Sequence, residues 1–115
     1  METKRLYREA QRMQCMAGDT LPEFHIFTDL DNEQIMGCTM ALIIEPLSSP
    51  GAAALTKQCA RYSEDDRHGF WVQLMTDDTA MLNGTYRMHF VMTDANAVQY
   101  RKLICDLSVL PVPEV

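Results

Sequence analysis

The side chains that could carry out nucleophilic chemistry in this chain are its cysteines and histidines. They are Cys15, Cys38, Cys59, Cys105, His25, His68 and His89. A thiol beside an imidazole can act as a nucleophile, but no local sequence signature singles out one of these cysteines. Nucleotide-binding, serine-hydrolase and zinc-protease motifs are also absent from the sequence. We therefore predict that the protein is not an enzyme and uses no cofactor, and a Cys-His enzyme is the least favoured of three hypotheses.

Three acids, Asp29, Asp31 and Glu33, alternate in the way that ligands of a hard cation can. A calcium-binding loop of the EF-hand type requires glycine at its sixth position and an acid at its twelfth. Counted from Asp29, those positions are Gln34 and Met40. The cysteines have neither a CxxC pair nor the Cys-His spacing of a zinc site. The sequence therefore predicts no metal site.

Charge is distributed unevenly along the chain, whose formal net charge is -6. The first 12 residues have a balance of +2, which leaves -8 on the remainder. Their basic residues are Lys4, Arg5, Arg8 and Arg12. The net charge argues against a nucleic-acid binder, because binding phosphates requires clustered Lys and Arg. Two interpretations stay open: the basic arm docks on the acidic surface of a neighbouring copy, or it is simply solvated.

Length and composition predict one folded domain. The chain has 115 residues, of which 47% are hydrophobic, enough for a single packed core. No apolar run approaches the roughly 18 residues of a membrane span, and the charged N-terminus does not resemble a secretory leader. We expect the four cysteines to be reduced and the protein to be made in a cytoplasm.

The elements that position these residues follow from hydrophobic alternation. Strands are predicted over 24–29, 37–45, 55–62, 70–75, 85–93 and 98–109. We interpret 29–34 as a polar turn, 63–69 as a solvated loop, and 76–82 as one short helical turn with Thr76 as its N-cap. The fold class is therefore all-β, an immunoglobulin-like antiparallel β-sandwich of about six to eight strands. Its domain covers 17–110, between an N-terminal arm over 1–16 and an extended tail over 111–115.

The entry into the strand 85–93 contains a structural corner formed by Leu82, Gly84 and Tyr86. Glycine adopts backbone conformations that other residues avoid, and the tyrosine is expected to bury its ring while its hydroxyl ties a loop. Phe70 and Trp71 allow two interpretations. Trp71 is either a core residue of a central strand, which we favour, or part of an aromatic platform that binds a sugar face.

The order of these motifs resembles small immunoglobulin-like sandwich proteins of tailed bacteriophages. It is similar to the N-terminal module of phage baseplate upper proteins. The matching segments are AGDT (17–20), FHI (24–26), GCTM (37–40), GFWVQL (69–74), TAMLNGTY (79–86) and LICDLSV (103–109). Cys105 and Asp106 stand where the pattern often has a glycine, and no long receptor-binding region follows the last strand.

The resemblance implies a structural virion protein, either a tail or baseplate component or a capsid-decorating one. Such a protein would be made in the bacterial host cytoplasm and then join the virion. Its partners would be other virion proteins and further copies of itself, with Lys4, Arg5, Arg8 and Arg12 as candidate partner-binding residues and no nucleic acid or membrane involved. The alternative function is a carbohydrate-binding module that uses exposed aromatic residues.

Overall fold

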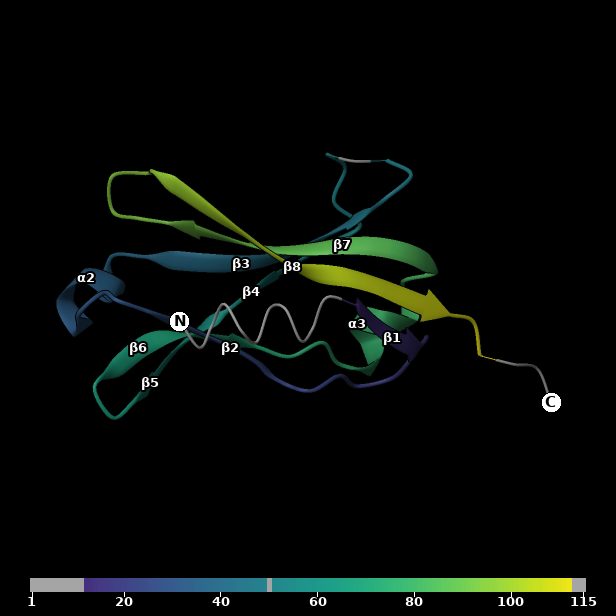
Figure 1. The fold of residues 1–115 in the computed structure, drawn as a ribbon, viewed down its shortest axis with the longest axis horizontal. Helices are drawn as coiled ribbons and strands as arrows, with labels where there is room; N and C mark the ends of the chain where they lie inside the picture. Colours follow the sequence, from purple (N-terminus) through teal and green to yellow (C-terminus); the bar gives the residue numbers. More distant parts are fainter. Residues whose placement is uncertain (1–11, 50, 113–115) are drawn as a thin grey trace.

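Two β-sheets pack face to face in the computed structural model, which describes residues 12–49 and 51–112. The larger sheet has the strand order β1-β8-β7-β3-β4, and the smaller has the order β2-β6-β5 (Figure 1). The predicted all-β sandwich is thus confirmed. No helix within the described ranges is long and apolar enough to cross a membrane.

The elements are short, and most neighbouring strands run antiparallel. The strands are β1 (Arg12–Met16), β2 (Phe24–Thr28), β3 (Thr39–Pro46), β4 (Leu55–Gln58), β5 (Ala60–Glu64), β6 (Arg67–Val72), β7 (Gly84–Thr93) and β8 (Gln99–Leu110). The helices are α2 (Asn32–Met36) and α3 (Thr76–Ala80). β1 differs from the other strands because it pairs with β8 in parallel.

The core lies between the sheets and follows the alternation of the sequence. Met40, Leu42 and Ile44 of β3 are buried at every second position, as predicted. β7 buries Met88 and Phe90 toward the same interior, and β6 contributes residues from the opposite sheet. The strands 37–45 and 85–93, and the hairpin that joins β7 to β8, are confirmed.

The predicted polar turn at 29–34 is wrong in its second half, where the chain forms α2. Asp31 is the N-cap, and its Oδ1 accepts a hydrogen bond from the Gln34 N–H at 2.7 Å. The Gln34 side chain accepts one from the Asp31 N–H at 3.0 Å in return. This reciprocal capping box stabilises a single helical turn. Asp31 therefore caps a helix of five residues.

The predicted single strand over 55–62 is two strands in different sheets. β4 pairs with β3, whereas β5 pairs with β6, and the chain changes sheet at Cys59. The predicted loop over 63–69 is also wrong, because β5 and β6 extend into it and only Asp65 and Asp66 form the turn. Asp65 has a φ of 55°, which a tight hairpin turn requires.

The helical turn after β6 is confirmed, although Thr76 is not its N-cap. The cap position is Met75, whose N–H donates a hydrogen bond to the Asp78 carboxylate at 2.8 Å. Asp77 and Asp78 lie in the first turn, as expected for acids at the positive end of a helix.

Residues 12–16, expected within the arm, form β1 and are hydrogen-bonded to the larger sheet. Their partners in β8 run from Asp106 to Leu110. β8 also contains an irregularity: opposite the step from Met88 to His89, its pairing moves from Cys105 to Leu103, so that Ile104 is the extra residue. Such a bulge increases the local twist of a strand.

Candidate functional site

Tyr86 closes the corner before β7. Its ring is buried, and its hydroxyl accepts a hydrogen bond from the Asn83 N–H at 2.7 Å and donates one to the Asn83 carbonyl at 3.0 Å. Gly84 has a φ of 114°, a backbone conformation that favours glycine. Leu82 is buried in the core. These groups fix the path of the backbone and present no reactive atom to solvent.

The thiols of Cys59 and Cys105 are poor nucleophiles in this environment. Cys15, Cys38 and Cys105 are buried, and Cys59 is partly buried. Burial raises the pKa of Cys59 to about 12, and burial together with the charge of Asp106 raises the pKa of Cys105 to about 11. Thiols with such values are protonated near neutral pH, whereas the thiolate is the reactive form.

Each histidine has a hydrogen-bond partner other than a thiol. His25 contacts Glu23 at 2.9 Å, and His68 contacts the Ser63 hydroxyl at 2.8 Å. His89 contacts both Glu45, at 3.4 Å, and Arg101, at 3.3 Å. Over residues 12–49 and 51–112, no group of three or more His, Cys, Asp or Glu side chains is arranged to hold a metal ion.

The predicted partner-binding residues lie mostly beyond the described part of the chain. Lys4, Arg5 and Arg8 fall in the segment 1–11, which the structure does not describe. The backbone of Arg12 is opposite Asp106 at the start of β1, and its side chain is not described.

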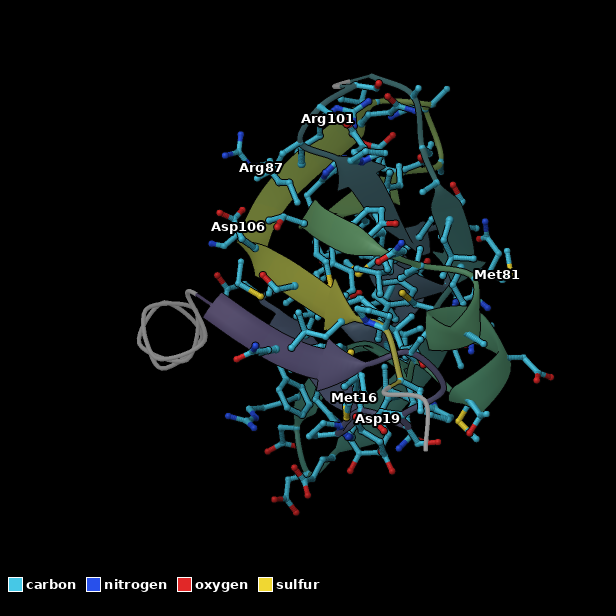
Figure 2. The ribbon with its side chains drawn as sticks, turned by 90° about the vertical axis from the view of Figure 1, so that its right-hand side faces the viewer. Met16, Asp19, Met81, Arg87, Arg101 and Asp106 are labelled. Atoms are coloured by element: carbon cyan, nitrogen blue, oxygen red, sulfur yellow. The ribbon has the colours of Figure 1, made fainter. Side chains whose placement is uncertain are left out.

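The outer face of the larger sheet carries charged side chains in pairs. Figure 2 shows Arg87 of β7 and Asp106 of β8 projecting from neighbouring strands on the same side of the sheet. The Arg87 Nε lies 3.5 Å from the Asp106 Oδ1. Both side chains are substantially exposed. Exposed pairs of this kind contribute on the order of 0 to 1 kcal/mol, so this face does not identify a site by itself.

The open side of the sandwich, which we define as the edge of β8 over 99–105 that faces away from β7 together with β2, is a stronger candidate. β7 pairs with β8 along its length, and the part of β1 that the structure describes pairs with the stretch from Asp106 to Leu110. The stretch 99–105 lies beyond this part of β1. Backbone N–H and C=O groups at the edge of a sheet can hydrogen-bond an added strand.

A groove runs along this open side. β2 is an edge strand of the smaller sheet, and its residues line the same hollow as the first residues of β8. This hollow has a volume of about 190 Å³. Its lining residues are Ile26, Phe27, Thr28, Met40, Met92, Tyr100, Arg101 and Lys102.

A second hollow of about 460 Å³ shares Met92 and Tyr100 with the first and extends the groove toward α2. Its other lining residues are Leu30, Gln34, Cys38, Asp94, Ala95 and Asn96. Most of the exposed lining is apolar, as in sites that bind side chains of a partner. Together the two hollows define the groove of the open side.

Arg61 holds one wall of this groove in place. Its guanidinium donates hydrogen bonds to the carbonyls of Ile35, Met36 and Cys38 at 3.2, 2.9 and 3.0 Å. These carbonyls lie at the C-terminal end of α2, where a positive charge is favourable. The bonds tie α2 to β5, so that Gln34 faces the larger hollow from a fixed element.

The opposite wall is organised by Asp94 at the tip of the β7–β8 hairpin. Its carboxylate accepts hydrogen bonds from the N–H groups of Val98 and Asn96 at 3.0 and 2.9 Å, and from the Tyr100 hydroxyl at 3.2 Å. The bonds from Val98, Asn96 and Tyr100 lower the pKa of Asp94 below its ordinary value. Tyr100 is thereby oriented while 51% exposed. An oriented, exposed tyrosine suits the role of an anchor for a partner.

Trp71 lies outside the core, so the favoured interpretation of this residue is wrong. Its neighbour Phe70 is buried, but Trp71 pairs with His25 and Ala60 on the outer face of the smaller sheet and is partly exposed. It contributes to a hollow of about 240 Å³. The remaining lining residues are Lys57, Gln58, Ala60, Val72, Gln73 and Met75.

The other aromatic rings on this face pack against one another. Tyr62 meets His25 edge-on, with 4.7 Å between centroids, and lies 5.9 Å from Phe27. The guanidinium of Arg67 lies 3.9 Å from the centre of the Phe27 ring, a cation-π contact. Trp71 lines the hollow of about 240 Å³, whereas Phe27 lines the smaller hollow of the open side.

Comparison with protein-family models and with curated protein sequences gave no match for this chain. The likeness to phage sandwich modules therefore rests on the sequence motifs alone. The open side was not predicted from the sequence. Two of the nine methionines, Met40 and Met92, line the groove, and methionine both fills cores and adapts to partner surfaces.

Proposed function

We propose that the protein is a non-enzymatic assembly module that binds an extended segment of another protein chain on its open side. The observation that carries this proposal is the groove beside the edge of β8 over 99–105, whose larger hollow has mostly apolar exposed lining and is bordered by the exposed Tyr100. In strand addition, backbone hydrogen bonds supply affinity and pockets for alternate side chains supply specificity. The open side offers both features in one place.

The side chains of the groove support the same function. Tyr100 is held by Asp94, and Met92 lies where the two hollows meet. Binding energy in interfaces is concentrated in a few such aromatic anchors, while methionine adapts its shape to a partner. Neither residue contributes a reactive group, which fits binding rather than catalysis.

We further propose that the assembly is a phage particle and that the sandwich is of the immunoglobulin-like type. The sequence motifs that resemble phage baseplate modules support this setting. In it, the protein is a tail, baseplate or capsid-decorating component that is made in the bacterial cytoplasm and functions in the virion. Other virion proteins and further copies of the chain are its partners.

The assembly function is tested by Tyr100→Ala in the full chain. Truncating a central aromatic anchor costs on the order of 1 to 2 kcal/mol or more, so we expect the association constant to fall about tenfold or more. Val98→Ala is the matched control, because Val98 is a similarly exposed apolar residue that does not line the groove. Sedimentation velocity over a concentration series measures the association constants of the two variants and of the parent. Equal association of the two variants and the parent would refute the proposal.

A second candidate function is carbohydrate binding, which the position of Trp71 favours. This residue is partly exposed and lines a hollow that Gln58 and Gln73 also line. Glycan-array binding that Trp71→Ala abolishes would support it. Tyr62→Ala is the matched control, because Tyr62 lies on the same face but does not line the hollow. Absence of glycan binding by the parent protein would remove this candidate.

A further inference from the structure

We propose that His89 of β7 is a pH-dependent switch on the outer face of the larger sheet. When its ring is neutral it holds the Arg101 side chain of β8, and when its ring is protonated it releases Arg101 and pairs with Glu45 of β3. This inference goes beyond the assembly function and does not depend on it. It combines three observations: two partners share one ring nitrogen, one of these partners is anchored elsewhere, and the neighbouring charged groups are placed away from His89.

The first observation is that one nitrogen atom of His89 has two partners of opposite chemistry. Its Nε2 lies 3.3 Å from Nη1 of Arg101 and 3.4 Å from Oε1 of Glu45. A guanidinium N–H only donates hydrogen bonds, whereas an ionised carboxylate only accepts them. An unprotonated Nε2 can therefore accept a hydrogen bond from Arg101, and a protonated Nε2 can donate one to Glu45. The protonation of this atom decides which neighbouring strand His89 is linked to.

Protonation of the ring also changes the forces on both partners. Histidine is the side chain that ordinarily changes its charge between about pH 5 and pH 8. A positive ring attracts the Glu45 carboxylate and repels the Arg101 guanidinium. The side chains of His89 and Glu45 are 12% and 21% exposed, so salt screens this interaction less than it screens charges on an open surface. The two partners consequently respond to one proton in opposite directions.

The second observation is that Glu45 has an anchor of its own, whereas Arg101 has none. The other carboxylate oxygen of Glu45, Oε2, accepts a hydrogen bond from the Gly51 N–H at 2.7 Å. Gly51 lies in the connection between β3 and β4, where its φ of 90° favours glycine. Among the residues that the structure describes, the exposed Arg101 side chain hydrogen-bonds only with His89. Arg101 is therefore the partner that moves.

The third observation concerns the other charged groups around His89. Arg87, two residues earlier on the same face of β7, pairs with Asp106 of β8. Lys102 of β8 and Lys57 of β4 are opposite buried core residues of their neighbouring strands, so both lie on the other face of the sheet. The described part of the connection between β3 and β4 contains no titratable side chain. Glu45 and Arg101 are thus the charged groups that the proton acts on.

The test is NMR on the full chain at pH 8 and pH 5. Carboxylates have an ordinary pKa of about 4, so mainly histidines change their charge between these two values. Long-range proton–nitrogen spectra of the histidine rings report whether Nε2 of His89 carries a proton, and His89→Gln assigns the signals. Nitrogen-15 relaxation of the arginine Nε–H groups reports how ordered each side chain is. Arg61 is the matched internal control, because it donates to three backbone carbonyls, which do not titrate.

At pH 8 we expect Nε2 of His89 to be unprotonated and the Arg101 side chain to be ordered. At pH 5 we expect both ring nitrogens to be protonated and Arg101 to lose its order, while Arg61 keeps its order. A proton on Nε2 at pH 8 would overturn the inference. So would an Arg101 side chain in the parent protein that is equally ordered at the two pH values.

Two variants separate the switch from a general effect of pH. His89→Gln cannot take up the proton, so the order of Arg101 should be the same at pH 8 and pH 5 in this variant. In Arg101→Met the neutral ring loses its donor, and we expect its proton to lie on Nε2, where it is donated to Glu45. A pH-dependent order of Arg101 in His89→Gln, or an unprotonated Nε2 at pH 8 in Arg101→Met, would contradict the proposed exchange of partners.

Discussion

The two halves of β8 differ in their surroundings. The half from Asp106 to Leu110 has β7 on one edge and β1 on the other, and it buries Leu107 and Val109 in the core. The half over 99–105 lies beyond the part of β1 that the structure describes, and its exposed Tyr100 borders a groove. We propose that a partner binds beside this second half.

The largest expected effect comes from the fully paired half. Leu107 has no exposed surface, so Leu107→Ala should lower the free energy of unfolding by about 2 to 5 kcal/mol through lost burial and the cavity that remains. Urea denaturation monitored by Trp71 fluorescence measures this. The matched change Leu110→Ala, at the exposed end of the same strand, should cost less than about 1 kcal/mol. Equal losses of unfolding free energy in the two variants would contradict the assignment of Leu107 to the core and Leu110 to the surface.

We expect Gly69→Ala to lower stability less than Leu107→Ala does, but to change the groove more. An added Cβ would lie 1.9 Å from the Ile26 carbonyl oxygen, so β2 must move away from β6. Overpacking of this kind costs about 1 to 3 kcal/mol. Because β2 is one wall of the groove, association should weaken along with stability. The matched change Gly18→Ala, where an added Cβ meets nothing within 4 Å but the φ of 93° remains strained, should destabilise without changing association. Weakened association in Gly18→Ala would contradict this assignment.

The smallest effect is a pH dependence at the hairpin tip. The Asp94 carboxylate has a lowered pKa because it accepts hydrogen bonds from Val98, Asn96 and Tyr100. Its stabilising contribution is therefore present above the ordinary aspartate pKa, about 3.9, and is lost as the pH falls through the lowered value in the folded protein. The Val98 and Asn96 amide resonances should shift together below about pH 4 in an NMR titration. Asp94→Asn should abolish this joint shift of the two resonances. If the shift persists in the variant, another acid causes it.

Much of the fold could be predicted from the sequence, because the alternation of hydrophobic and polar residues indicates which side chains are buried. Met40, Leu42 and Ile44 defined β3, and the corner at Gly84 and Tyr86 marked the start of β7. The capping box of α2 could also have been predicted, because the N-cap acid Asp31 is followed three residues later by Gln34. It was missed because the surrounding residues are polar and were interpreted as a turn.

The rest depends on pairing between distant segments, which a single sequence does not specify. No residue near Cys59 signals that β4 and β5 belong to different sheets. The outward orientation of Trp71 likewise depends on its register with β2, because either face of a strand can carry an aromatic residue. The groove of the open side could not be predicted for the same reason, because its lining comes from β2 and β8, which lie far apart in the sequence.

The most direct test of the open side is amide hydrogen exchange of the full chain, measured by mass spectrometry at concentrations below and above self-association. Exchange protection reports local pairing of the backbone. We predict that 106–110 is protected at every concentration, and that 99–105 exchanges faster in the dilute protein and becomes protected as copies associate. Protection of 99–105 that is equal to that of 106–110 in the dilute protein, or that does not increase on association, would contradict the account.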